Sequence, residues 1–145
     1  MMDEEHPAEL DSIYPVGEKQ PERVRTRHGR PLADLTLDNL LAGHVTASDF
    51  TITAEGLRLQ AEIAQQAGRP NLARNLRRGA ELVEIPDDVL LEIYELLRPG
   101  RAHSAGDLQA AADRLRRIYG AEETAGLIEE AATAYARRGI FDRRI

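Results

Sequence analysis

The stretch Val45–Asp88, VTASDFTITAEGLRLQAEIAQQAGRPNLARNLRRGAELVEIPDD, predicts two complete helices and the start of a third. Thr53 is a candidate N-cap, because its hydroxyl can accept a hydrogen bond from a free backbone N–H of the first turn. The first helix should run to about Ala67 and end at Gly68, since glycine readily takes the left-handed conformation that ends helices. Pro70 suits the first position of the next helix, where its missing N–H has no helical partner to lose.

The second helix should run from about Asn71 to Val83, and Pro86 should begin the third. Asp87 and Asp88 would lie in the first turn of that third helix, where the helix dipole favours acidic side chains. Further cap and glycine signals predict a short helix after Thr36 and two long helices, Ser104–Gly120 and Glu122–Arg138. The chain is therefore expected to be all-α, a compact multi-helix fold.

The first helix carries apolar side chains around more of its circumference than one contact with a core requires. At 100° per residue they cover roughly 200°, whereas a surface helix of a self-contained bundle usually shows a narrower stripe. The side chains concerned are Leu57, Leu59, Ala61, Ile63, Ala64 and Ala67, with Gln60 among them. We expect this helix to be packed on two sides.

Apolar and basic side chains should occupy opposite faces of the second helix. The apolar face consists of Leu72, Leu76, Gly79, Ala80 and Val83, and the basic face of Arg74, Arg77 and Arg78. Glu81 is spaced to pair with the arginines before it. The basic face could be a solvated surface, a protein interface or a nucleic-acid-binding surface; the lack of interleaved aromatic side chains on which bases could stack argues against the last.

Composition excludes several classes of protein. Hydrophobic residues make up 42% and charged residues 30% of the 145 residues, which is typical of a globular domain. The net charge of −6 argues against a nucleic-acid or anionic-membrane partner. Cysteine is absent, and no apolar run approaches the roughly 20 residues of a membrane span. The acidic start, MMDEEHPAEL, does not resemble a signal peptide, so we expect a cytoplasmic chain.

The amino-acid composition divides the chain into an N-terminal arm, residues 1–30, and a helical domain, residues 31–145. Residues 1–30 combine acidic side chains with scattered Pro and Gly, and we expect an extended arm that is disordered or ordered only against something else. Tyr14, next to Pro15 and Val16, could anchor this arm on a surface. Residues 31–145 form the predicted helical domain.

No residues combine into a recognisable active site. The histidines at positions 6, 28, 44 and 103 lack the spacing of a helical metal pair, and the glycines stand singly rather than in a phosphate-binding loop. Asp87–Asp88 and Glu129–Glu130 are explained by a helix first turn and a solvated face. No residue is therefore predicted to be catalytic, to bind a cofactor or to ligate a metal. Surplus apolar surface without an active site indicates a subunit of a larger assembly.

Ordered motifs extend this interpretation over nearly the whole chain. They are Tyr14–Pro15, LTLDNL at Leu35–Leu40, the run Val45–Arg69, GAEL at Gly79–Leu82, IPDD at Ile85–Asp88, EIY at Glu92–Tyr94, LRP at Leu97–Pro99 and EAAT-x-Y at Glu130–Tyr135. In this order and register the chain resembles the small (gamma) subunit of adenosylcobalamin-dependent diol and glycerol dehydratases.

The resemblance implies a small subunit of an α₂β₂γ₂ assembly that contributes no catalytic or cofactor residue. In that family the large (alpha) subunit holds the substrate, and adenosylcobalamin lies between the large and medium (beta) subunits. The radical reaction converts 1,2-propanediol to propionaldehyde, or glycerol to 3-hydroxypropionaldehyde, so the enzyme is a hydro-lyase. The start MMDEEHPAELDS lacks the amphipathic helix that targets some relatives to bacterial microcompartments, so we expect any such association to occur only through partner subunits.

The hypothesis is thus a chain that braces the large subunit. The predicted interface consists of Tyr14, Leu57, Leu59, Gln60, Ile63, Arg74 and Arg77. The alternative is a free-standing helical adaptor or nucleic-acid-binding module that uses Arg74, Arg77 and Arg78.

Overall fold

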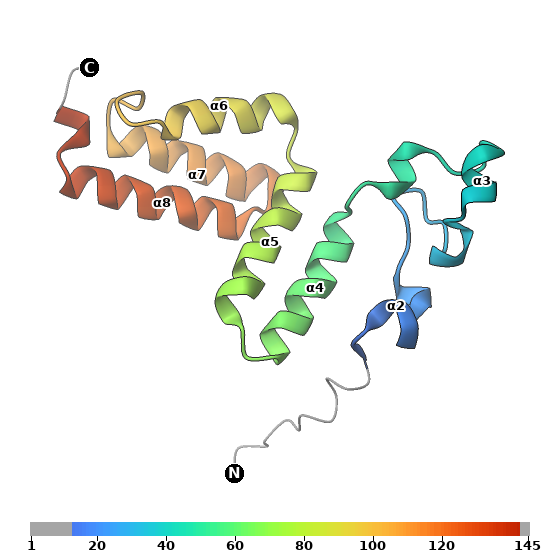
Figure 1. The fold of residues 1–145 in the computed structure, drawn as a ribbon. Helices are drawn as coiled ribbons and strands as arrows, with labels where there is room; N and C mark the ends of the chain where they lie inside the picture. Colours follow the sequence, from blue (N-terminus) through green and yellow to red (C-terminus); the bar gives the residue numbers. More distant parts are fainter. Residues whose placement is uncertain (1–12, 143–145) are drawn as a thin grey trace, which may run out of the picture. The chain divides into compact units, whose positions relative to one another are not determined.

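The structure, a computed structural model, describes residues 13–142. Within this range helices and turns account for the regular structure, and the one β interaction is an isolated antiparallel bridge between Arg25 and Pro31. The all-α prediction is confirmed. The chain divides into two compact units, residues 1–76 and residues 77–145 (Figure 1). No helix within residues 13–142 combines the length and apolar character needed to cross a membrane.

The first unit places several short elements before one long helix. Its elements are α2 (Val16–Lys19), η1 (Pro21–Arg23), η2 (Leu32–Asp34), α3 (Leu37–Leu41), η3 (Ala47–Phe50), α4 (Ala54–Gln66) and the beginning of α5 (Pro70–Glu84). A short turn joins α4 to the beginning of α5, and the two run side by side in opposite directions (Figure 1).

The predicted ends of these helices are confirmed. The Thr53 hydroxyl accepts a hydrogen bond from the Gly56 N–H at 3.0 Å, and the Thr36 hydroxyl accepts one from the Asn39 N–H at 3.2 Å. Gly68 has a φ of +73°, the left-handed conformation that ends α4. Local capping signals therefore fix the boundaries before any packing is considered.

The second unit is a helical bundle around an aliphatic core. It contains the rest of α5, then α6 (Asp87–Leu97), α7 (Ala105–Tyr119), α8 (Glu122–Arg137) and η4 (Ile140–Asp142). Leu108, Leu115 and Ile128 are fully buried. Ala112 and Ala125 are also fully buried, and small residues at such positions let α7 and α8 pack closely. With no Trp in the chain, this core consists mainly of Leu, Ile, Val and Ala.

Two longer-range contacts complete this unit. The Tyr135 hydroxyl donates a hydrogen bond to the Leu97 carbonyl at 2.6 Å, and the Tyr135 ring lies edge-on to Phe141, with centroids 6.2 Å apart. The Glu81 carboxylate accepts hydrogen bonds from the Glu123 and Thr124 N–H groups and from the Thr124 hydroxyl. Glu81 therefore does more than pair with arginines of its own helix, the role predicted for it.

The apolar face predicted for α5 is partly wrong. Ala80 is fully buried as expected, but so is Ala73, while Leu72 and Val83 remain about half exposed. Helical periodicity shows which residues share a face, but not which of two neighbouring faces another segment covers. The structure buries the small residues and leaves large ones uncovered.

The described part of the predicted arm contains short helical turns, α2 and η1, as well as extended backbone. Residues 1–12, including the acidic start and His6, lie outside the described residues, as do residues 143–145 of the tail. The division at residue 30, and the need for a partner to order the arm, stay predictions.

Candidate subunit interface

Helix α4 presents two apolar faces, as its sequence indicates. Leu57, Ala61 and Ala64 are buried within the chain, at the i, i+4 and i+7 positions of one face. Leu59 and Ile63 lie on a second face and are only partly buried. The chain itself therefore covers one face of α4 and leaves the other partly open.

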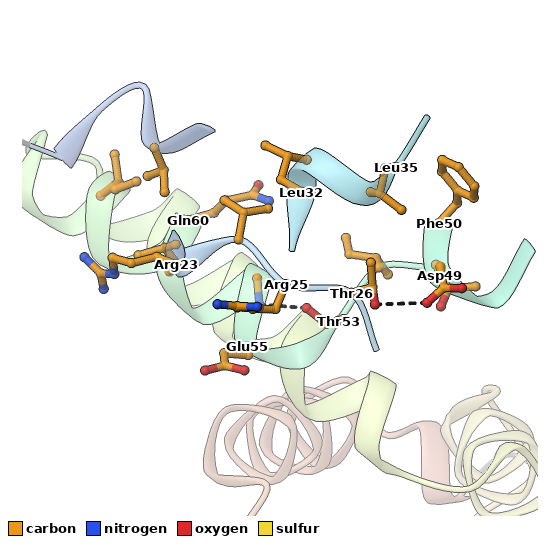
Figure 2. A pocket seen from close by; sticks show the side chains of 17 residues that line it. Arg23, Arg25, Thr26, Leu32, Leu35, Asp49, Phe50, Thr53, Glu55 and Gln60 are labelled. Carbon is orange, nitrogen blue, oxygen red and sulfur yellow. Dashed lines mark hydrogen bonds between the residues drawn. The ribbon is translucent and has the colours of Figure 1, made fainter. Parts of the chain in front are cut away.

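A groove of about 350 Å³ runs along this second face, and we call it the α4 groove (Figure 2). Its apolar lining consists of Val16, Val24, Leu32, Leu35, Phe50, Ile52, Leu59 and Ile63. In Figure 2, Leu32, Leu35 and Phe50 lie along one rim, while Arg25 and Glu55 lie along the other. The groove thus joins α4 to segments that precede it by up to forty residues.

Large apolar side chains of the segment that precedes α4 remain exposed to solvent. They are Leu37, Leu40 and Leu41 on α3, Phe50 at the end of η3 and Ile52 after it, and we call this set the α3–η3 patch. Phe50 and Ile52 also line the α4 groove. Leu41 is 77% exposed and Phe50 is 55% exposed. Isolated exposed apolar residues are ordinary, but five large ones within sixteen residues are typical of a binding surface. A short helix was predicted after Thr36, but its leucines, Leu37, Leu40 and Leu41, were not included in the predicted interface.

A second groove, of about 550 Å³, lies between α4 and the beginning of α5. It brings together three predicted interface residues, Tyr14, Gln60 and Ile63, with Leu72 and Leu76 of α5. Tyr14 is 63% exposed at this site. Leu72, predicted to lie on the apolar face of this helix, thus lines an open surface.

The other predicted interface residues lie elsewhere. Leu57 is 8% exposed, so it has little surface to offer a partner. Arg74 is exposed and Arg77 is partly buried, and neither lines either groove. The roles of all three in an interface stay predictions.

A buried polar cluster forms part of the α4 groove wall. The Thr26 hydroxyl donates to Asp49 Oδ1 at 2.9 Å (Figure 2). Asp49 Oδ2 accepts from the Thr46 N–H at 3.0 Å. The Thr46 hydrogen bond, with help from Thr26, holds the pKa of the Asp49 carboxyl below its usual value. Thr46 and Asp49 form a capping box within one turn, whereas Thr26 lies far from both in the sequence, so sequence spacing alone does not predict its contact with Asp49.

In the second unit, charged side chains tie α7 to α8. Arg116 hydrogen-bonds Glu129 and Glu122, the latter at 2.8 Å. These two carboxylates, Glu129 first, raise the pKa of Arg116 further above its usual range. The arrangement is a structural ion-pair network that joins α7 to α8.

No group of three or more His, Asp or Glu side chains within residues 13–142 is arranged to hold a metal ion. His28 Nε2 lies 2.9 Å from the Ser48 hydroxyl. The exposed surface of the two grooves is mainly apolar, although polar side chains also line the α4 groove, so the grooves suit a protein surface better than a charged cofactor.

Comparison with known proteins agrees with this description. The model of the dehydratase small-subunit family matches residues 10–142. The propanediol dehydratase small subunit of Citrobacter freundii is 50% identical over 125 residues, 86% of this chain and 72% of the relative. The corresponding protein of Salmonella typhimurium strain LT2 is 49% identical over 127 residues, 88% of this chain and 73% of the relative. With the family model spanning both units, and two relatives about half identical to most of its length, this chain belongs to the dehydratase small-subunit family.

Proposed function

We propose that this chain is the non-catalytic small subunit of a coenzyme B12-dependent diol dehydratase, in which it braces the large catalytic subunit. The high identity to two propanediol dehydratase small subunits supports 1,2-propanediol as a substrate of the assembly. Glycerol would react in the same way, by radical dehydration to an aldehyde. The resemblance of the sequence to that family supports an α₂β₂γ₂ assembly with large and medium subunits.

We assign adenosylcobalamin and the substrate to the other subunits. The described residues of this chain offer no cluster of metal ligands, and the exposed surface of its two grooves is mainly apolar. Its contribution is therefore stability and positioning of the large subunit rather than chemistry. Cytoplasmic location belongs to the same proposal.

One observation carries the proposal: the second face of α4 and the neighbouring α3–η3 patch present large apolar side chains that the chain does not cover. Burying one leucine or isoleucine in a partner contributes roughly 1.5–3 kcal/mol, so a few such residues suffice for stable association. We place the contact with the large subunit along the α4 groove, through Leu59, Gln60 and Ile63, and at Tyr14.

Leu59→Asp tests this placement. A carboxylate buried in an apolar contact without a partner costs more than the leucine contributes, so the large subunit should no longer co-purify with this chain. The matched control is Leu91→Asp, the same change on α6 of the second unit, where Leu91 is 69% exposed and lies outside the proposed contact. Co-purification should survive the control.

Circular dichroism of both variants separates lost binding from lost folding. If Leu59→Asp is as helical as the parent and still co-purifies with the large subunit at full activity, α4 is not part of the contact. If instead Leu91→Asp alone abolishes co-purification, the contact lies on the second unit.

The alternative, a free adaptor or nucleic-acid-binding module, is less well supported. Arg77 and Arg78 are partly buried, which leaves a smaller basic surface on α5 than the sequence indicated. A steep salt dependence of nucleic-acid binding by the chain alone would favour that alternative.

A further inference from the structure

Thr26 and Asp49 are unusual among the described residues because they are polar and almost fully buried, at 9% and 5% exposure. They come from segments twenty-three residues apart and meet in the wall of the α4 groove (Figure 2). A buried carboxylate is costly unless it is hydrogen-bonded, so such a pair persists only when its partners are fixed.

The hydrogen bonds of the Thr26 hydroxyl use its full capacity. It donates to Asp49 Oδ1 and accepts from the His28 N–H at 3.3 Å and the Arg30 N–H at 3.1 Å. A hydroxyl has one proton and two lone pairs, so no capacity remains. One side chain thus organises its own turn and joins that turn to Asp49.

Backbone hydrogen bonds close the same turn. The Thr26 N–H donates to the Arg30 carbonyl and the Gly29 N–H to the Thr26 carbonyl, both at 2.9 Å. On the other segment, Asp49 accepts from Thr46 in the capping box of η3. The cluster therefore connects two turns, each of which also has hydrogen bonds of its own.

A second side-chain contact joins the same two turns on the exposed side of the cluster. His28 Nε2 and the Ser48 hydroxyl are 2.9 Å apart, and the Ser48 hydroxyl is 2.9 Å from that of Thr46. The residues next to the cluster, Val24 and Arg25 on one segment and Phe50 on the other, line the α4 groove. If the two turns separated, opposite walls of the groove would separate with them.

We infer that Thr26 and Asp49 form a clamp that folds residues 25–31 onto the 46–50 turn within the free chain, so that the α4 groove exists before any partner binds. The inference goes beyond the proposed function and does not depend on it. It differs from the sequence-based expectation that residues 1–30 become ordered only against another surface.

Amide hydrogen exchange of the full, isolated chain tests the clamp with Thr26→Val, which keeps the shape of the side chain and removes the hydroxyl. In the parent, the amides of His28, Arg30 and Thr46 should be protected. In the variant, protection at all three should fall about tenfold or more, the factor expected from losing a hydrogen bond to a charged acceptor. Thr46 is the informative amide, because it does not bond to Thr26 itself.

Thr51→Val is the matched control, since the exposed Thr51 hydroxyl donates only to the nearby Ser48 carbonyl. It should leave the three amides protected. Two results would overturn the clamp: exchange of the His28 and Arg30 amides at the unprotected rate in the parent, or unchanged Thr46 protection in Thr26→Val.

Loss of protection in α7 and α8 would reveal that Thr26→Val unfolds the chain. In that case a second variant tests the clamp. Asp49→Asn keeps the volume and one acceptor oxygen, and should expose the same three amides while α7 and α8 stay protected. Asparagine cannot accept from both Thr26 and Thr46, because an NH₂ group replaces one carboxylate oxygen. The double variant should exchange no faster than the more affected single variant, because both changes weaken the same cluster. Unchanged protection in Asp49→Asn, or additive effects in the double variant, would contradict the inference.

Discussion

Glu81 shows how one side chain can supply a cap that the sequence of a helix lacks. The N-cap position of α8 is Ala121, which has no side chain able to accept a hydrogen bond. The Glu81 carboxylate takes this role from α5, accepting the Glu123 N–H at 2.9 Å and the Thr124 N–H at 2.8 Å. Its negative charge also lies at the positive end of the α8 dipole. Glu81 should therefore matter more to stability than a glutamate on the surface.

Glu81→Ala should lower the free energy of unfolding by about 1–3 kcal/mol, because it leaves the first N–H groups of α8 without their acceptor. Glu81→Gln, which keeps one oxygen, should cost less. Urea denaturation of the full chain followed by circular dichroism measures both. The exposed Glu22 of the first unit is the control, and Glu22→Ala should change stability by less than about 0.5 kcal/mol. Equal losses for Glu81→Ala and Glu22→Ala would rule out the capping role.

Asp49 should make the stability of the chain depend on pH in the acid range. Its pKa in the folded state lies below the usual value of about 3.9, so its contribution is fully present above that pH. As the pH falls through the lower folded-state pKa, the carboxyl is protonated and the contribution is lost. The urea midpoint of the parent should therefore fall more steeply below pH 4 than that of Asp49→Asn. The exposed Asp38 gives the control, since Asp38→Asn should follow the parent. Parallel curves for the parent and Asp49→Asn would refute the assignment.

At the scale of helices, two glycines should respond in opposite directions to the same change. Gly120 ends α7 with a φ of +62°, and a Cβ there would meet no atom within 4 Å, so the cost of alanine is conformational. Gly126 lies inside α8 and also has room for a Cβ. Gly120→Ala should destabilise the chain by about 1–2 kcal/mol, whereas Gly126→Ala should stabilise it by roughly 0.5–1 kcal/mol. Thermal denaturation of the two variants measures the difference, and shifts of the same sign would contradict the helix assignments.

Helix boundaries were predictable because their causes are local. Thr53, Ser104 and Gly120 each act within one turn of their own position, and the structure confirms all three. The buried face of α5 was not predictable to the same degree, since it depends on which segment lies against it. Ala73 is buried and Leu72 is exposed for that reason alone.

The candidate interface could be predicted only in part for the same reason. The two apolar faces of α4 follow from helical spacing, and the structure leaves Leu59 and Ile63 partly open. The hydrogen bond between Thr26 and Asp49, and the one between Glu81 and α8, each join segments that are far apart in the sequence. The spacing of residues within one segment does not predict contacts with a segment far away in the sequence.

On the scale of the whole molecule, large apolar side chains are exposed on both units. The second unit buries a continuous aliphatic core, mainly from α6, α7 and α8, but leaves Leu91 and Tyr94 exposed. On the first unit the exposed Tyr14 and Phe50 line two grooves, and the proposed contact with a partner is placed there for that reason. The amount of exposed apolar surface also makes the isolated chain prone to association.

Reconstitution of the dehydratase from purified subunits tests the central claim most directly. The large and medium subunits, with adenosylcobalamin and 1,2-propanediol, are assayed for aldehyde and for co-elution, with and without this chain. The account predicts that omission of this chain lowers turnover and weakens the assembly, and that adding it back restores both. If the large–medium pair forms aldehyde at the full rate and elutes as an equally stable assembly in its absence, the bracing role is wrong.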